Sequence, residues 1–152
     1  MRSQAFSAIV LAFVALVTPA LASSPDDKIY DQTTIADLES KIGQAPAREQ
    51  CFLYAELIHQ MTEFSLRQYA AGDVDNASQL LKQVQQVVQK MHLSFADNNK
   101  RLKNAEILLR HSAFRLKEML RSSSTEDRPL VEATLAQVNQ AETETMLQVF
   151  RK

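Results

Sequence analysis

The chain has 152 residues, of which 17 are basic, 18 are acidic and one is a cysteine. A chain of this length forms a single domain. Its formal net charge of −1 excludes a general polyanion binder, so we expect no nucleic-acid partner. A single cysteine excludes an internal disulfide, and the apolar core alone must therefore hold the fold.

The first 22 residues have the pattern of a cleaved secretory signal. Arg2 supplies a positive charge, residues 7–17 form an apolar run, and Ala20 and Ala22 satisfy the small-x-small rule of signal peptidase. This run is much shorter than the about 20 apolar residues that a spanning helix needs. We therefore expect cleavage after Ala22, a periplasmic or secreted protein, and no membrane span once the signal is removed.

The mature chain is predicted to begin with a flexible segment, residues 23–32, followed by a single helical domain, residues 33–152. Within TTIADLESKI, residues 33–42, one short apolar stripe predicts a first helix that a threonine caps and that ends before Gly43. A second helix is predicted over residues 46–71, closed by Gly72.

Polar residues mark the starts of the later helices. Asp73 or Asp75 is expected to cap a third helix, and residues 124–129 open the last one, which runs to about Phe150. No window of the mature chain alternates apolar and polar residues as a strand does. The fold class is therefore predicted to be all-α.

The arrangement of the helices depends on the segment ADNNKR, residues 96–101. Aspartate and asparagine favour a turn there, which predicts an up-down four-helix bundle of long antiparallel helices preceded by a short helix. The alternative is a three-helix arrangement in which residues 73–121 form one continuous helix of about 48 residues, roughly 72 Å long. That alternative is favoured by apolar residues that stay seven apart, as in a coiled coil: Val74, Leu81, Val88, Phe95, Leu102, Leu109 and Leu116.

The segment YAAGDVDNASQLLKQV resembles the turn of a tetratricopeptide hairpin, with Gly72, Val74 and Ala77 at suitable places. Only one such unit is visible, and arrays of this kind need about three repeats. The resemblance therefore implies an antiparallel helical hairpin at this position and no repeat array.

The stretch CFLYAELIHQM, residues 51–61, contains the residue types of a metal or haem site. On a helix, however, His59 points about 80° away from Cys51 and about 160° away from Met61. Cys51 and His59 are also roughly 12 Å apart along the axis, whereas ligands lie within about 2.0–2.3 Å of a metal. Cys51 and Met61 are therefore predicted to be core residues.

No sequence pattern nominates a catalytic site. The serines at residues 122–124 fall at a helix connection, and the chain has no glycine-flanked nucleophile and no phosphate-binding loop. We expect a non-enzymatic protein with no cofactor and no metal. The alternative is a small cofactor- or metal-binding helical bundle of the periplasm, because bundle sites are assembled across helices.

Two charged stripes have a spacing of seven residues. The acidic stripe, on the second helix opposite its apolar centre, consists of Glu49, Glu56 and Glu63. The basic stripe, on the flank of the fourth helical segment, consists of Lys103, Arg110 and Lys117. Residues 98–121 as a whole contain seven basic and two acidic residues, a local excess in an acidic chain. Solvated faces explain such stripes in general, because exposed ion pairs contribute only about 0–1 kcal/mol.

Ile107 and Phe114 lie about 120–140° from Leu102, away from the main apolar face. A helix that is apolar on two sides has two neighbours. In one interpretation the short first helix covers both residues. In the other they are the centre of a docking face, which consists of Lys103, Ile107, Arg110, His111, Phe114 and Lys117.

The basic rim of this face favours an acidic partner. The candidates are a second copy that offers its acidic stripe, an envelope protein, or an anionic envelope surface. The sequence thus predicts an exported helical interaction module that binds a protein partner or self-associates.

Overall fold

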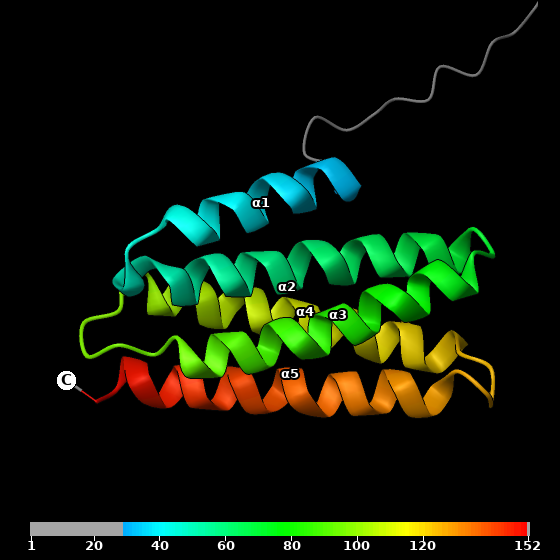
Figure 1. The fold of residues 1–152 in the computed structure, drawn as a ribbon. Coiled ribbons are helices and arrows are strands. Elements are labelled where there is room, and N and C mark those ends of the chain that lie inside the picture. The colour runs from blue at the N-terminus through cyan, green and yellow to red at the C-terminus, as the bar shows by residue number, and fades with distance from the viewer. Residues whose placement is uncertain (1–28, 152) are drawn as a thin grey trace, which may run out of the picture.

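The computed structural model describes residues 29–151, and the predicted signal peptide lies outside this range, as do residues 23–28 of the predicted flexible segment. Five α-helices hold 81% of the described residues, and no strand is present among them (Figure 1). The all-α prediction is confirmed. None of these five helices is both long enough and apolar enough to cross a membrane.

Helix α1 (Gln32–Gln44) begins at a capping box. The Asp31 carboxylate accepts a hydrogen bond from the Thr34 amide at 2.9 Å, and the Thr34 hydroxyl accepts one from the Asp31 amide at 3.0 Å. The prediction that a threonine caps this helix is therefore wrong. Asp31 is the cap because its side chain reaches the amide three residues ahead, and Thr34 is its reciprocal partner.

Helices α2 (Ala47–Ala70) and α3 (Val74–Leu93) form the antiparallel hairpin that the sequence implied. The turn needs Gly72, whose φ of +85° lies in the region that favours glycine. Of the two candidate caps for α3, Asp73 is the one used: its carboxylate accepts a hydrogen bond from the Asn76 amide at 3.2 Å.

Helices α4 (Leu102–Ser122) and α5 (Arg128–Val149) form a second hairpin. Its connection is tied to the end of α2 through one tyrosine. The Tyr69 hydroxyl accepts a hydrogen bond from the Ser124 amide at 3.1 Å and donates one to the Asp127 carboxylate at 3.2 Å.

The helical conformation is interrupted between α3 and α4, at residues 94–101. The alternative of one continuous helix over residues 73–121 is therefore wrong. Within the break, the Asn99 side chain accepts a hydrogen bond from the Ala96 amide at 3.3 Å. Helix α3 ends at Leu93, and Arg101, the N-cap residue of α4, adopts a left-handed conformation with φ +58° that redirects the chain into α4. The Lys100 amide then donates to the Arg48 carbonyl at 2.8 Å, which places the start of α4 beside the start of α2.

The four long helices form a bundle in which α2 contacts α3 and α4, and α5 contacts α4 and α3. The pairs α2–α5 and α3–α4 lie across the diagonals, without contact between their backbones in the described range. Successive helices alternate in direction, as predicted, but the segment of residues 94–101 crosses a diagonal rather than joining neighbours. As a result α2 lies parallel to α4, and α3 lies parallel to α5.

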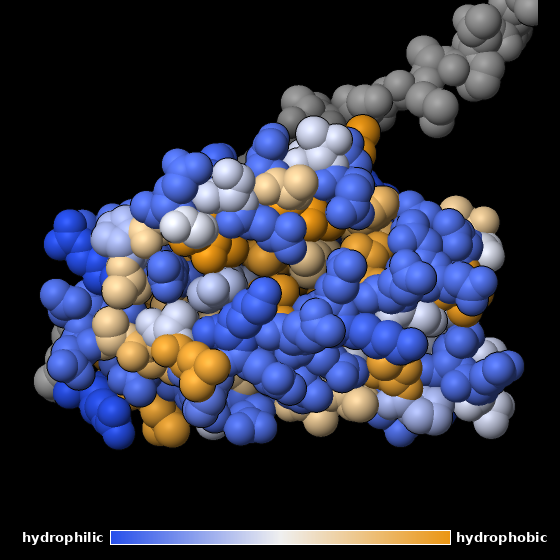
Figure 2. Space-filling model, in the orientation of Figure 1, coloured by the Kyte–Doolittle hydropathy of each residue, from blue (hydrophilic) through white to orange (hydrophobic). Residues whose placement is uncertain are grey.

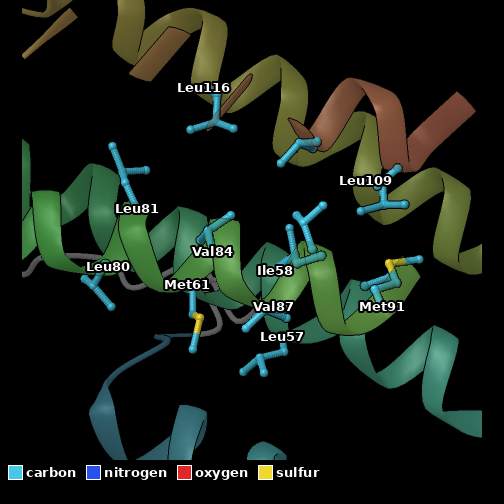
Figure 3. Close-up of a cluster of buried hydrophobic side chains, with 14 of the residues drawn as sticks. Leu57, Ile58, Met61, Leu80, Leu81, Val84, Val87, Met91, Leu109 and Leu116 are labelled. Carbon is cyan, nitrogen blue, oxygen red and sulfur yellow. The ribbon is translucent and has the colours of Figure 1, made fainter. Parts of the chain in front are cut away.

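Side chains from all four long helices fill the bundle axis. Figure 3 shows Ile58 of α2, Met91 of α3 and Leu109 of α4 in this cluster, and Val138 of α5 is also fully buried. The prediction of a core position for Cys51 and Met61 is confirmed, since their side chains are 0% and 1% exposed.

Helix α1 lies outside the bundle. Ile35, Leu38 and Ile42 are buried, and among the described helices α1 contacts only α2 (Figure 1). Its position leaves the outer surfaces of α3, α4 and α5 uncovered.

Candidate functional site

The predicted docking face lies on the outer surface of α4, opposite the buried side of this helix. Ile107 is 45% exposed and Phe114 is 59% exposed. The other four residues of the face are also exposed: Lys103, Arg110, His111 and Lys117. We call the surface made by these six residues the α4 face.

The short first helix does not cover Ile107 and Phe114. Helix α1 packs on α2 and makes no backbone contact with α4 within residues 29–151. The interpretation that these two side chains are internal is therefore wrong. They are two large apolar groups in the middle of a solvent-facing surface.

The basic rim differs from the sequence prediction in one residue. Arg110 forms ion pairs with Glu106 on its own helix and, at 3.5 Å, with Glu142 on α5. Its charge is therefore balanced within the chain. Lys103 and Lys117 form no ion pair among the described residues, so they supply the net charge of the face.

The acidic stripe on α2 is not a free surface. Glu63 accepts a hydrogen bond from Arg115 of α4 at 2.8 Å, and Glu49 lies 3.7 Å from Lys100. Glu56 lines a pocket beside α1 with Tyr30. Two of the three carboxylates therefore already have partners in the same chain, which reduces the charge that this stripe could offer to a second copy.

Three aromatic rings meet where α2 and α4 touch. The His59 ring centroid lies 5.9 Å from that of Tyr30 and 6.2 Å from that of His111. The His59 Nδ1 atom is buried and has no hydrogen-bond partner in the described range. Burial lowers the pKa of His59, Glu63 opposes this shift, and His111 and Arg115 reinforce it.

A groove runs between the C-terminal halves of α3 and α5 and has a volume of about 500 Å³. The residues that line this α3–α5 groove are Val88, Gln89, Met91, His92, Leu93, Phe95, Gln137, Gln140, Ala141 and Glu144. Sequence reasoning missed this groove. The only signal in the sequence was Leu93, an apolar residue outside the core stripe of its helix.

No group of three or more His, Cys, Asp or Glu side chains within residues 29–151 is arranged to hold a metal ion. Burial raises the pKa of the Cys51 thiol to about 12, so this sulfur is not a nucleophile at neutral pH.

The surfaces described above are interpreted from their own chemistry, because comparisons with known proteins identified no relative. No protein-family model, curated protein or solved structure matched the chain.

Proposed function

We propose that the chain is an exported, non-enzymatic helical interaction module that docks an acidic protein partner on the α4 face. The observation that carries this proposal is the exposure of Ile107 and Phe114, one above the other on the outer side of α4. Two turns separate them, so both contact one partner surface. Export rests on the signal-peptide pattern of residues 1–22.

The charges around the apolar pair support an acidic partner. Lys103 and Lys117 lie on the same outer surface, and Arg121 continues it by one more turn. None of these three cations has an ion-pair partner in the described part of the chain. Charge complementarity of this kind mainly raises the association rate, and it weakens as salt concentration rises.

The test begins with capture in the native compartment. A photo-crosslinking amino acid is placed at Phe114, and in a matched control at Leu147, an exposed apolar residue of α5. We expect a discrete adduct only from position 114, with a protein whose contact surface is acidic. Adducts of equal yield from both positions would contradict a specific α4 face.

Binding of the purified partner then tests the residues. The double variant Ile107→Asp with Phe114→Asp should remain folded and weaken binding at least tenfold, because two exposed apolar anchors are lost. Lys103→Glu with Lys117→Glu should slow association and reduce its salt dependence. If the captured protein is a second copy of this chain, the α4 face serves self-association, and the proposal of a different, acidic partner is overturned. Undiminished binding by the double aspartate variant would end the proposal.

A cofactor-binding bundle is the rival function. An absorption spectrum and elemental analysis of protein from its native compartment separate the two classes. A Soret band or a stoichiometric metal would overturn the proposal of a plain interaction module.

A further inference from the structure

We propose that the α3–α5 groove binds a small, uncharged and mostly apolar molecule that carries one hydrogen-bond donor. This site lies on other helices than the α4 face, and it takes a small molecule rather than a protein. It therefore goes beyond the proposed function and stands or falls independently of it.

The floor of the groove is apolar. Val88, Met91 and Ala141 are all buried and form this floor. Leu93, which is 84% exposed, and the half-buried Phe95 form its apolar rim. Figure 2 shows hydrophobic residues at the lower left, where the C-terminal ends of α3 and α5 lie in Figure 1.

Contacts join α3 and α5 at two levels along the helices. The Gln85 side chain donates to the Thr134 hydroxyl at 2.9 Å, and His92 lies 2.7 Å from Glu144 nearer the C-terminal ends. Between these levels the α5 residues that line the space are Gln137, Gln140 and Ala141, and the methyl group of Ala141 fills little of it. The two hydrogen-bonded contacts and the small side chain of Ala141 therefore leave a concave surface between α3 and α5.

One polar atom in this lining lacks a partner. The side-chain oxygen of Gln137 is buried and makes no hydrogen bond within the described residues. A buried acceptor left unpaired costs about 1–3 kcal/mol. Gln137 as a whole is only partly buried, so rotation of its side chain toward the groove would bring this oxygen to an N–H or O–H group of a ligand and remove that cost, which is why we assign a donor to the occupant.

His92 and Glu144 are the only titratable residues of the lining, and they lie 2.7 Å apart, whereas Gln89, Gln137 and Gln140 are neutral. An anionic ligand would be repelled by the Glu144 carboxylate, and a cationic ligand would have to compete with His92 for it. The lining therefore favours an uncharged ligand. The volume of about 500 Å³ falls in the range of small-molecule sites. At about 30 Å³ per non-hydrogen atom, the share of a water molecule in the liquid, it holds roughly 16 such atoms.

N-phenyl-1-naphthylamine is a suitable probe, since it is uncharged, has about 17 non-hydrogen atoms and one N–H donor, and fluoresces more strongly in apolar surroundings. Titration with the full mature protein should give saturable binding with one probe per chain. From the usual affinity per atom of drug-sized ligands, a Kd of roughly 100 µM or tighter is expected. 1-Phenylnaphthalene, which lacks the donor, should bind about three- to tenfold more weakly.

Variants assign the probe to the groove. Ala141→Met should abolish binding by filling the space, and Gln137→Leu should remove the preference for the donor. Leu93→Ser, at an exposed rim position, keeps the fold intact and should weaken binding about threefold or more. Phe114→Ser on the α4 face is the control and should bind the probe normally.

Three outcomes would overturn the proposal. The first is probe binding that does not saturate. The second is binding that Leu93→Ser and Gln137→Leu leave unchanged. The third is fluorescence enhancement that appears only at concentrations where sedimentation shows a dimer, since the groove would then be filled by a second copy. A failed α4 face with normal probe binding, or the reverse, would separate the two proposals.

Discussion

Arg115 of α4 donates a hydrogen bond over 2.8 Å to Glu63 of α2, a residue 52 positions earlier in the chain. The same offset of 52 relates His111 to His59, whose rings are in contact, and Lys100 to Arg48 in the backbone hydrogen bond. Because one offset holds from the start of the two helices to their C-terminal halves, α2 and α4 run parallel and in constant register. The seam between them joins the two hairpins.

The pair Glu63–Arg115 should stabilise this seam. Both side chains are partly screened from water, and Arg115 also pairs with Glu118. A double-mutant cycle of Glu63→Ala and Arg115→Ala, measured by urea denaturation, should give a coupling free energy of about 1 kcal/mol, the upper end for such pairs. The matched control is the pair Glu49–Lys100, which is longer and more exposed. Equal coupling in both cycles would contradict the larger contribution expected of the shorter and less exposed pair.

The stability of the protein should fall as the pH drops below neutrality, in part because of His59. Its pKa in the folded state lies below the ordinary value of about 6.5, chiefly through burial. In the unfolded chain His59 therefore takes up a proton at a higher pH than in the folded state. The stabilising effect is complete above about pH 6.5 and is lost as the pH falls through the lower folded-state pKa.

Urea midpoints of wild type and His59→Leu at pH 7.5 and pH 5 test this expectation. The variant should lose less stability between the two pH values than the wild type. His111→Leu is the comparison variant: because His111 adds to the lowering of the His59 pKa, its removal should reduce the loss of stability less than His59→Leu does. Tyr30, Glu63 and Arg115 surround His59 and are kept in all variants. Parallel pH profiles for His59→Leu and wild type would refute the assignment.

Cys51 should resist modification in the folded protein. Its side chain is fully buried, and its thiol has a pKa of about 12, so almost no thiolate is present at pH 8. A thiol reagent should react only after addition of denaturant, and a non-reducing gel should show no disulfide-linked dimer. Rapid labelling under native conditions would show that this part of α2 opens.

At Arg101, whose backbone is left-handed, replacement by glycine should destabilise the protein less than replacement by alanine. Its backbone conformation costs a residue with a side chain about 1–2 kcal/mol, whereas glycine adopts it freely. Both replacements lose the stacking of the guanidinium 3.5 Å above the Phe52 ring, so that loss cancels in the comparison. Arg101→Gly should therefore be about 1 kcal/mol more stable than Arg101→Ala. At Lys103, inside α4, the order should reverse because glycine weakens a helix.

Export should produce a shortened chain. Edman sequencing of the protein from the cell envelope or medium should begin at Ser23, because signal peptidase is expected to cut after Ala22. Replacement of Ala20 and Ala22 by bulky residues should leave the precursor uncut. A membrane-bound form that retains Met1 in the unaltered protein would rule out this interpretation.

Local structure was largely predictable from the sequence. Gly72 and Asp73 determine the turn between α2 and α3 through their own conformational preferences, and the apolar spacing identified the buried side of each helix. At residues 96–101 the heptad spacing of the apolar residues favoured a continuous helix, which the structure does not have. Phe95 and Leu102 stay in register, yet the backbone between them turns, because hydrogen bonding by Asn99 competes with the helix.

Which helices become neighbours was not predictable in this way. Glu63 and Arg115 each have the pattern of a solvated surface residue, and only the diagonal crossing of the chain brings them together. The α3–α5 groove has the same origin: nothing local to Leu93 or Gln137 indicates that their helices lie side by side. For Ile107 and Phe114, position on the helix showed only that the pair lies away from the main apolar face, and the packing of α1 on α2 alone was needed to show that the pair is exposed.

The diagonal crossing also makes the molecule suited to exchange between copies. Each hairpin is complete in itself, and residues 94–101 are the only covalent link across the interface between them. With this segment extended, the α2–α3 hairpin of one molecule can pack on the α4–α5 hairpin of another and reproduce the same contacts. Deletions that prevent the segment from spanning the diagonal should therefore convert monomers into intertwined dimers without any new interface chemistry.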